Sequence, residues 1–351
     1  MRHLSASGRV ERPRRDTLFR PSLDAPGSDR GISLPRKVLD AGTLLHDHAP
    51  PSITGLEEQV AELHKQVEQL QQQQAMPTVV LEHYRDSICY IYGAYRVGFH
   101  GQPPSLRAHI SGTGFVVAGG LIATNRHVAE PWYRDPQADA VIRRGATPSL
   151  QRLIAFFPGS PTPVELAPAV ISANTDLAVL RLEHSQLAEK LEPLPLATEP
   201  SPAGDNVTVI GYPMGVAGMV AKSPTAIYER LAFGRDDIGA ARELAVLSLI
   251  RPFATRGYLG DVVGNKLIYD VPTAHGGSGG PVFNSQGKVI AVNSAFIDGF
   301  SGGTLGISVQ SLLPLIEAAD HQIRVAVVSA EKEMFHQSYA GSSREPHMTR
   351  R

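Results

Sequence analysis

The sequence predicts an all-β fold, a sandwich or a barrel of short strands, with a helical segment before it and a helix at its end. Between about residues 78 and 320, short apolar runs recur and are broken by Gly, Pro, Asn and Asp, a pattern typical of strands joined by turns. The 33 glycines and 27 prolines of the 351-residue chain suit many such turns. Leu and Val residues at heptad spacing precede this region and indicate a helix.

The first 50 residues lack the pattern of a folded segment. They are rich in Arg, Pro, Gly and Asp and show no apolar periodicity, so we expect residues 1–50 to be a disordered tail. His46-Asp47-His48 lies in this tail. A metal site needs three or four positioned ligands, so we interpret this triplet as a solvated polar cluster and expect no metal.

Residues 54–76 predict one amphipathic helix that ends just before Pro77. Its apolar residues are spaced 4, 3, 4 and 3 apart, which is the a–d register of a coiled coil; they are Leu56, Val60, Leu63, Val67 and Leu70. Two interpretations stay open. The helix joins a homo-oligomer or a helical partner through this stripe, or it docks on its own domain.

Seven apolar runs predict strands within a domain over residues 80–322. They are Ile88–Tyr92, Gly114–Ala118, Leu121–Thr124, Leu177–Leu182, Val207–Ile210, Pro281–Phe283 and Val289–Asn293. Cys89 lies inside the first run, which favours a buried structural thiol over a catalytic nucleophile. Residues Ser308–Asp320 predict a closing amphipathic helix, and residues 328–351 a flexible polar tail.

The composition limits the partners and the compartment that we expect. The net charge of −1 favours neither nucleic acid nor an anionic membrane as a partner. The sequence has no run of 18 apolar residues, so we expect no membrane span. The N-terminus has no apolar stretch of the secretory kind, and the single cysteine allows no intrachain disulfide, so we expect a cytoplasmic protein.

Three segments carry residues with catalytic chemistry. In the first, a predicted hairpin turns at Gly119-Gly120 and His127 follows it directly. In the second, Asp176 stands at the entrance to a strand; in the third, four glycines flank Ser278. Taken singly, these are an ordinary strand-end histidine, a turn-capping aspartate and a flexible loop. A nucleotide phosphate loop is excluded, since Val289 follows Gly287-Lys288 where Ser or Thr is required.

The chemistry of acyl transfer needs these three residue types together. A serine hydroxyl is a weak nucleophile at neutral pH and needs a base within hydrogen-bond reach. Histidine titrates in the right range, and a carboxylate behind it fixes the tautomer and stabilises the imidazolium. Backbone N–H groups stabilise the developing oxyanion, and each is worth about 3–4 kcal/mol.

The three segments resemble the chymotrypsin-like family, most closely the catalytic domain of its disulfide-free, HtrA-type bacterial branch. Thr124-Asn-Arg-His127-Val is similar to the family's histidine motif, Asp176-Leu-Ala-Val-Leu to its aspartate motif and Gly276-Gly-Ser278-Gly-Gly-Pro281 to its serine motif. Gly211-Tyr-Pro-Met-Gly215 resembles a turn of the bacterial branch. Over about residues 85–320 the resemblance implies two six-stranded β-barrels and a C-terminal helix. No PDZ-like module follows in this sequence.

The resemblance also implies roles for individual residues. Ser278 would be the nucleophile, His127 the general base and acid, and Asp176 the residue that orients it. The N–H groups of Gly276 and Ser278 would form the oxyanion hole. Ser294 would support Asp176 and begin the strand that pairs with substrate, which comprises Ser294, Ala295 and Phe296.

The same resemblance places specificity residues at Pro272 and Thr273. No carboxylate is present there, so we expect a small or medium apolar side chain at P1, the residue before the cleaved bond. Thr273 also resembles a position in glutamate-specific relatives, but Asn293 replaces their partner histidine, which makes acidic specificity the weaker alternative. We interpret His275 as a plain loop residue rather than as part of the pocket rim.

The resemblance thus implies a serine endopeptidase that hydrolyses polypeptides through an acyl-enzyme, with no metal and no organic cofactor. The alternative is a catalytically silent pseudoprotease that binds peptides, or an adaptor whose helix is its main functional part. The presence of His127, Asp176 and Ser278 favours the enzyme.

Overall fold

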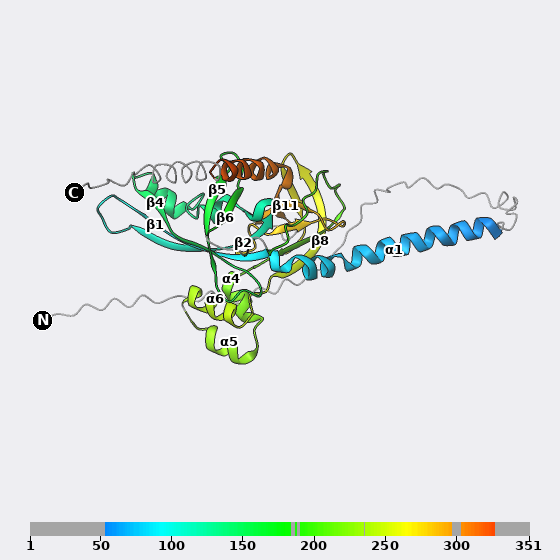
Figure 1. Ribbon diagram of the computed structural model, residues 1–351, viewed down its shortest axis with the longest axis horizontal. Helices are drawn as coiled ribbons and strands as arrows, with labels where there is room; N and C mark the ends of the chain where they lie inside the picture. The colour runs from blue at the N-terminus through cyan, green and yellow to red at the C-terminus, as the bar shows by residue number, and fades with distance from the viewer. Residues whose placement is uncertain (1–52, 184–186, 188–189, 235, 297–302, 327–351) are drawn as a thin grey trace, which may run out of the picture. The chain divides into compact units, whose positions relative to one another are not determined.

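The computed structural model describes residues 53–183, 187, 190–234, 236–296 and 303–326 (Figure 1). The tails predicted over residues 1–50 and 328–351 lie outside these ranges. The chain divides into two units, residues 1–59 and 60–351, and of the first unit only the beginning of one helix is described. None of the helices in the described ranges has both the length and the apolar composition of a membrane-spanning segment.

Twelve strands of the described residues form two closed antiparallel barrels. The first barrel has the strand order β1-β2-β3-β6-β5-β4. Its strands are β1 (Ile88–Gly98), β2 (Leu106–Val117), β3 (Leu121–Thr124), β4 (Thr147–Phe156), β5 (Val164–Ile171) and β6 (Ala178–Leu182). The turn between β2 and β3 contains Gly119 at φ 75° and Gly120 at φ 69°, a left-handed backbone that glycine adopts without strain.

The second barrel has the order β10-β11-β12-β9-β8-β7. Its strands are β7 (Asn206–Gly211), β8 (Phe253–Val263), β9 (Lys266–Tyr269), β10 (Pro281–Phe283), β11 (Val289–Phe296) and β12 (Thr304–Ser308). A 3₁₀ turn, Val309–Ser311, leads into a helix over residues 313–326. The helix begins a few residues later than Ser308, its predicted start, because the 3₁₀ turn comes first. Pro314 lies in its first turn, where proline is tolerated.

Strand β1 explains how the two barrels share one core. Side chains alternate along a strand, and here Ile88 and Tyr90 face a cluster that contains residues of both barrels, while Cys89 and Ile91 face the interior of the first. Cys89 is fully buried, as predicted, and burial raises the pKa of its thiol to about 12. The thiol is therefore a packing group rather than a nucleophile.

Helix α1 (Ile53–Tyr84) is longer than predicted, because it passes through Pro77 and ends only at Tyr84. The predicted end at residue 76 is wrong. Val80 is 2% exposed in the shared core, and the Tyr84 ring stacks on Phe283 with centroids 6.1 Å apart. Burial of these last turns offsets the hydrogen bond that Pro77 cannot donate.

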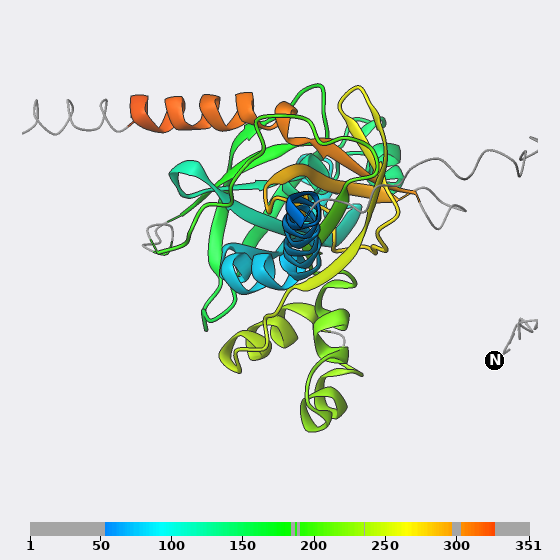
Figure 2. The ribbon, with the colours of Figure 1, turned by 90° about the vertical axis from the view of Figure 1, so that its right-hand side faces the viewer.

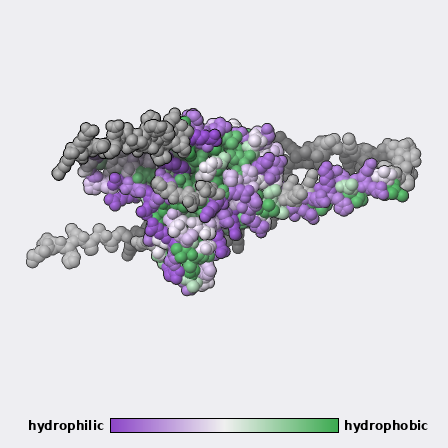
Figure 3. Space-filling view, viewed as in Figure 1, coloured by the Kyte–Doolittle hydropathy of each residue, from purple (hydrophilic) through white to green (hydrophobic). Residues whose placement is uncertain are grey.

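A group of short helices between β7 and β8 was not predicted. It comprises α4 (Gly215–Ala221), α5 (Thr225–Leu231) and α6 (Asp237–Val246), which lie together on one side of the barrels (Figures 1 and 2). Met219 of α4 and Leu244 of α6 are buried in the shared core. The exposed side of the group carries Phe233, 85% exposed, and Figure 3 shows apolar surface over this part of the molecule.

The predicted all-β class is confirmed, as are the two six-stranded barrels and the C-terminal helix that the resemblance implied. The sequence patterns located seven of the strands but not β4, β5, β8, β9 and β12. Two short helices after β3 also escaped prediction. They are α2 (Arg126–Ala129) and α3 (Pro136–Ile142), and both border the cleft described next.

Candidate active site

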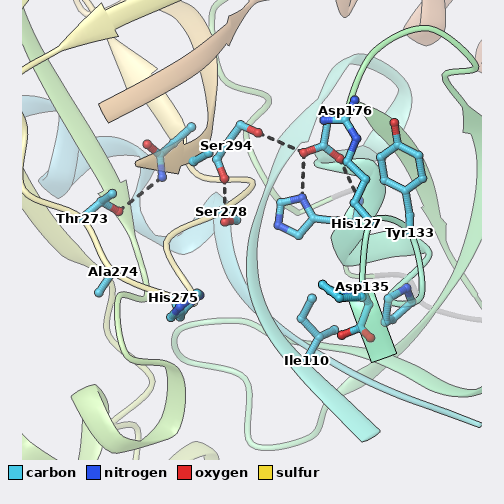
Figure 4. Close-up of a pocket in the computed structure, with 15 residues that line it drawn as sticks. Ile110, His127, Tyr133, Asp135, Asp176, Thr273, Ala274, His275, Ser278 and Ser294 are labelled. Atoms are coloured by element: carbon cyan, nitrogen blue, oxygen red, sulfur yellow. Dashed lines mark hydrogen bonds and ion pairs between the residues drawn. The ribbon is translucent and has the colours of Figure 1, made fainter. Parts of the chain in front are cut away.

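A cleft of about 470 Å³ receives residues from both barrels (Figure 4). His127 and Asp176 contribute from the first barrel, and Ser278 and Ser294 from the second. The predicted catalytic residues, 49 and 102 positions apart in the chain, therefore line a single cavity.

The His127 ring is held by Asp176. Their atoms Nδ1 and Oδ2 lie 2.7 Å apart, and the backbone N–H of His127 donates to Asp176 Oδ1 over 2.9 Å. His127 lies in the single turn of α2, directly after β3, whereas Asp176 lies two residues before β6, the neighbour of β3 in the barrel. Asn125, fully buried, donates to the Asp176 carbonyl over 2.9 Å and fixes the backbone of the aspartate.

The environment of Asp176 keeps its carboxylate ionised. Burial alone would raise the pKa of this carboxyl, but the hydrogen bonds and charge of His127 and the hydroxyl of Ser294 outweigh burial and lower the pKa below its usual value. Ser294 donates to Asp176 Oδ2 over 3.0 Å. An ionised carboxylate accepts the Nδ1 proton, which leaves the other ring nitrogen able to accept a proton.

The Ser278 hydroxyl makes a different hydrogen bond from the one expected. It donates to the Ser294 carbonyl over 2.9 Å, and within the described residues it makes no hydrogen bond with His127. Figure 4 shows the second ring nitrogen of His127 turned toward Ser278. Rotation about the Cα–Cβ bond of Ser278 is therefore the movement that would bring hydroxyl and imidazole together.

The backbone of loop 274–278 is held mainly through its carbonyl groups. Each of its five carbonyls accepts a hydrogen bond from the protein. For residues 274 to 278 in turn, the donors are Gly277 N, Met214 N, the Thr113 hydroxyl, the Asn293 amide and Thr113 N. The N–H groups of Gly276 and Ser278 donate to no acceptor among the described residues. These two donors were predicted to form an oxyanion hole, and this role stays a prediction.

Gly276 is required in this loop. Its φ is +94°, and a Cβ on it would lie 2.5 Å from the Tyr212 carbonyl oxygen. A larger residue would push the loop away from the turn at Met214, whose N–H holds the His275 carbonyl at 2.6 Å. The turn Gly211–Gly215, singled out in the sequence, thus supports the loop of Ser278.

Thr113 is a supporting residue that the sequence did not reveal. It is fully buried in β2 of the first barrel. Its hydroxyl donates to the Gly276 carbonyl over 2.7 Å and accepts from Tyr212 N over 3.0 Å, while its own N–H donates to the Ser278 carbonyl over 2.8 Å. Thr113 thereby joins the first barrel to the serine loop of the second.

The predicted specificity residues are only partly brought together. Thr273, Ser294 and Ala295 line the cleft, but Pro272 is exposed and does not line it. Phe296 ends strand β11 opposite Thr304, and its side chain lies outside the described atoms.

Asn293 forms the inner wall beside Thr273. Its amide donates to the Gly277 carbonyl over 2.9 Å and approaches Thr273 Oγ1 at 3.4 Å, while its oxygen accepts from the buried Tyr269 hydroxyl over 2.8 Å. Both amide hydrogens are therefore engaged within the protein.

The opposite wall comes from the segment that follows α2. Pro131, Tyr133, Arg134, Asp135 and Pro136 line the cleft there, and the sequence had not indicated any of them. His275 also lines the cleft, so its interpretation as a plain loop residue is wrong. The described residues contain no group of three His, Cys, Asp or Glu side chains placed to hold a metal ion.

Comparison with known proteins gives one family match and several distant relatives. A family model described as a trypsin-like peptidase domain matches residues 112–292, more than half of the chain. The chain is 28% identical over 221 residues to a glutamyl endopeptidase of Staphylococcus epidermidis, covering 62% of this chain and 61% of the relative. It is 28% identical over 205 residues to a probable periplasmic DegP-like serine endoprotease of Rhizobium meliloti, covering 58% of this chain and 31% of the relative.

Among solved structures, the serine endoprotease of Yersinia pestis aligns with 69% of this chain and 66% of its own, at 17% identity and a TM-score of 0.45. The chain spans less than two thirds of the length of the two sequence relatives.

Proposed function

The chain belongs to the trypsin-like peptidase domain family, and from this premise we propose that it is a serine endopeptidase that cleaves polypeptides through an acyl-enzyme. The observation that carries the proposal is the 2.7 Å contact between His127 and Asp176 in the cleft that Ser278 also lines. It supports an imidazole with the tautomer and the orientation of a general base.

In the proposed reaction, Ser278 Oγ rotates from the Ser294 carbonyl toward His127 and attacks the carbonyl carbon of the substrate. His127 takes the hydroxyl proton, and Asp176 stabilises the imidazolium. The N–H groups of Gly276 and Ser278 stabilise the oxyanion. His127 then protonates the leaving amine, and the acyl-enzyme is hydrolysed by water through the same base.

A fluorophosphonate probe tests the proposal, because it phosphonylates only an activated serine. We expect the wild type to be labelled and Ser278→Ala not to be labelled. Ser105→Ala is the matched control, because Ser105 is exposed and does not line the cleft. Absence of labelling in a wild type that is folded by circular dichroism would contradict the proposal and favour the peptide-binding pseudoprotease.

We propose that the P1 pocket takes a small or medium uncharged side chain. The residues that line the cleft on the side of the second barrel include Thr273, Ala274, Asn293 and Ala295, none of which carries a charge. The relative from Staphylococcus epidermidis is named a glutamyl endopeptidase, but the amide hydrogens of Asn293 are already engaged and offer no donor to a carboxylate. Peptides that differ only at P1 should be cleaved faster with Ala, Val or Leu than with Glu or Lys. A preference for Glu would contradict this.

We also propose that α1 associates with a second copy of this chain. Its five stripe residues, Leu56 to Leu70, are between 45% and 59% exposed, and Figure 3 shows small apolar patches along an otherwise hydrophilic helix. In heptad register they form a seam that a copy of the same helix would cover.

Light scattering tests this association. Leu63→Ser with Leu70→Ser should reduce the mass to that of one chain, whereas Glu58→Ser with Lys65→Ser, on the opposite side of the helix, should not. A wild type that is monomeric at micromolar concentration would contradict the association.

A further inference from the structure

Arg134 is the cation of the cleft wall that lies beyond His127. The chain leaves α2 at Ala129, turns, and enters α3 at Pro136. The turn places Tyr133, Arg134 and Asp135 along the same cleft as Ser278. This wall is separated from Thr273 by the catalytic residues themselves (Figure 4).

The other charged groups on this side of the cleft already have partners. Asp176 is paired with His127. Asp135 caps α3 and accepts from Ala138 N over 2.7 Å. Arg126, next to the cleft, is paired with Glu130 at 2.7 Å. Arg134 makes no ion pair with any described residue, and a guanidinium stays charged throughout the working pH range.

The position of Arg134 is fixed by its neighbours. Its backbone has a φ of 60°, which is uncommon for a residue with a side chain. Its guanidinium carbon lies 5.0 Å from the centre of the Tyr133 ring. Arg126 lies 4.1 Å from the same centre and is itself bonded to Glu130 and to the Ser172 carbonyl. Tyr133 is therefore an anchored platform for Arg134.

A bound polypeptide would have to pass this wall. If its acyl portion pairs with β11 and its P1 side chain lies near Thr273, the residues beside P1 come against the segment that follows His127. An unpaired guanidinium there attracts a carboxylate and repels an ammonium group.

We propose that Arg134 is a specificity-determining residue that favours polypeptides with Asp or Glu beside the cleaved residue, at P2, P1′ or P2′. The inference rests on the proposed peptidase function and names its substrate class. It is independent of the uncharged P1 pocket, because the two sites lie on opposite sides of Ser278.

The test uses the full-length chain and peptides with one common P1 residue. Glu, Gln or Lys is placed in turn at P2, P1′ and P2′, and the kcat/KM ratio of the Glu to the Gln peptide is measured. At one or more of these positions we expect a ratio of about five, which is the effect that one exposed ion pair has on an equilibrium. The ratio should decrease as salt is added.

Substitutions of Arg134 then identify the source of the preference. Arg134→Lys should keep it, Arg134→Gln and Arg134→Gly should bring the ratio to about one, and Arg134→Glu should favour the Lys peptide. Glycine suits the positive φ and provides a second neutral variant. Arg143→Gln, the same charge change at the exposed end of α3 and outside the cleft lining, should leave the ratio unchanged.

Two results would overturn the inference. One is a wild-type ratio of one at all three positions, and the other is a ratio that Arg134→Gln and Arg134→Gly do not alter. Either result in a chain that the fluorophosphonate labels and that cleaves the peptides refutes the role of Arg134 alone. A chain that is not labelled refutes the peptidase function as well.

Discussion

At the scale of single residues, the candidate site depends on buried polar groups that have exact partners. Thr113 does not line the cleft, yet its hydroxyl and its N–H donate hydrogen bonds to two carbonyls of the Ser278 loop. The Gly276 N–H shares its peptide plane with the His275 carbonyl, which Met214 N holds, and the Ser278 N–H shares its plane with the Gly277 carbonyl, which the Asn293 amide holds. Thr113 in the first barrel holds the two neighbouring peptide units and so anchors the loop that carries these N–H groups.

Thr113→Val is expected to lower kcat/KM by about 10- to 100-fold, because the loop that carries Ser278 and the proposed oxyanion donors loses an anchor on the first barrel. It should also lower the free energy of unfolding by about 1–3 kcal/mol, since the buried Tyr212 N–H loses its acceptor. Thr113→Ser keeps the hydroxyl and should retain most of the activity. Peptide kinetics and urea unfolding of both variants measure the effects; equal losses in Val and Ser would show that the hydroxyl is not the cause.

Asp176→Asn is expected to destabilise the protein in a pH-dependent way. The pKa of Asp176 is lower in the folded protein than its usual value of 3.8. The ionised carboxylate therefore contributes stability above about pH 4, and this contribution is lost as the pH falls through the lowered pKa. The difference in unfolding free energy between wild type and variant should be present at pH 7 and should shrink between pH 5 and pH 3. Urea unfolding at these three values measures it, and a difference that grows in acid would contradict it.

The sequence made some of these residues predictable and not others. His127, Asp176 and Ser278 lie in local motifs, so short segments were sufficient to select them. Thr113, Asn125 and Arg134 act through contacts with residues far along the chain or through a turn conformation, and single segments carry no signal for either. The hydrogen bond from Ser278 to the Ser294 carbonyl belongs to a rotamer, which residue types do not specify.

At the scale of helices and strands, the patterns succeeded where burial is continuous. Strands β3 and β10 are buried along their whole length, and both were predicted with their observed bounds. Strand β8 is exposed at most positions and has no apolar run, so its pairing with β7 and β9 could not be inferred. Helices α4 to α6 are short and are stabilised by tertiary packing, which local propensity does not report.

Pro77→Ala is expected to raise the free energy of unfolding by about 1–3 kcal/mol. Pro77 lies inside α1, where its ring removes a backbone donor and strains the preceding turn. The turns that follow pack into the shared core, so their stability contributes to that of the whole fold. Urea unfolding measures the gain.

Pro224→Ala is the control for this change. Pro224 stands at the start of α5, where no helical hydrogen bond is lost, so its replacement should give no comparable gain. A similar increase in both variants would mean that the helical position of Pro77 is not the reason.

At the scale of the whole molecule, one buried cluster contains residues of both barrels, besides the separate cluster inside the first barrel. Tyr212, 1% exposed at the end of β7, donates its hydroxyl to the Ile88 carbonyl over 2.9 Å, and its ring lies 5.8 Å from that of Tyr90. Because the cleft opens between the barrels, any loosening of this contact would also displace Ser278 relative to His127. Stability and catalytic geometry are therefore expected to change together.

Tyr212→Phe is expected to lower the unfolding free energy by about 1 kcal/mol while the barrels still unfold in one transition. Trp132, the only tryptophan of the chain, packs near Tyr95 of β1 and reports on the first barrel. Its fluorescence should follow the same urea curve as far-UV circular dichroism, in wild type and variant alike. Separate midpoints for the two signals would show that the barrels unfold independently.

The hydrogen bonding of loop 274–278 bears on how inhibitors would act. Its carbonyls already accept hydrogen bonds from the protein, so with the proposed oxyanion hole a peptide aldehyde or boronate would require only a side-chain torsion of Ser278. Such torsions take nanoseconds, far less than a backbone rearrangement. Inhibition should set in as fast as the compound arrives, with progress curves that show no lag.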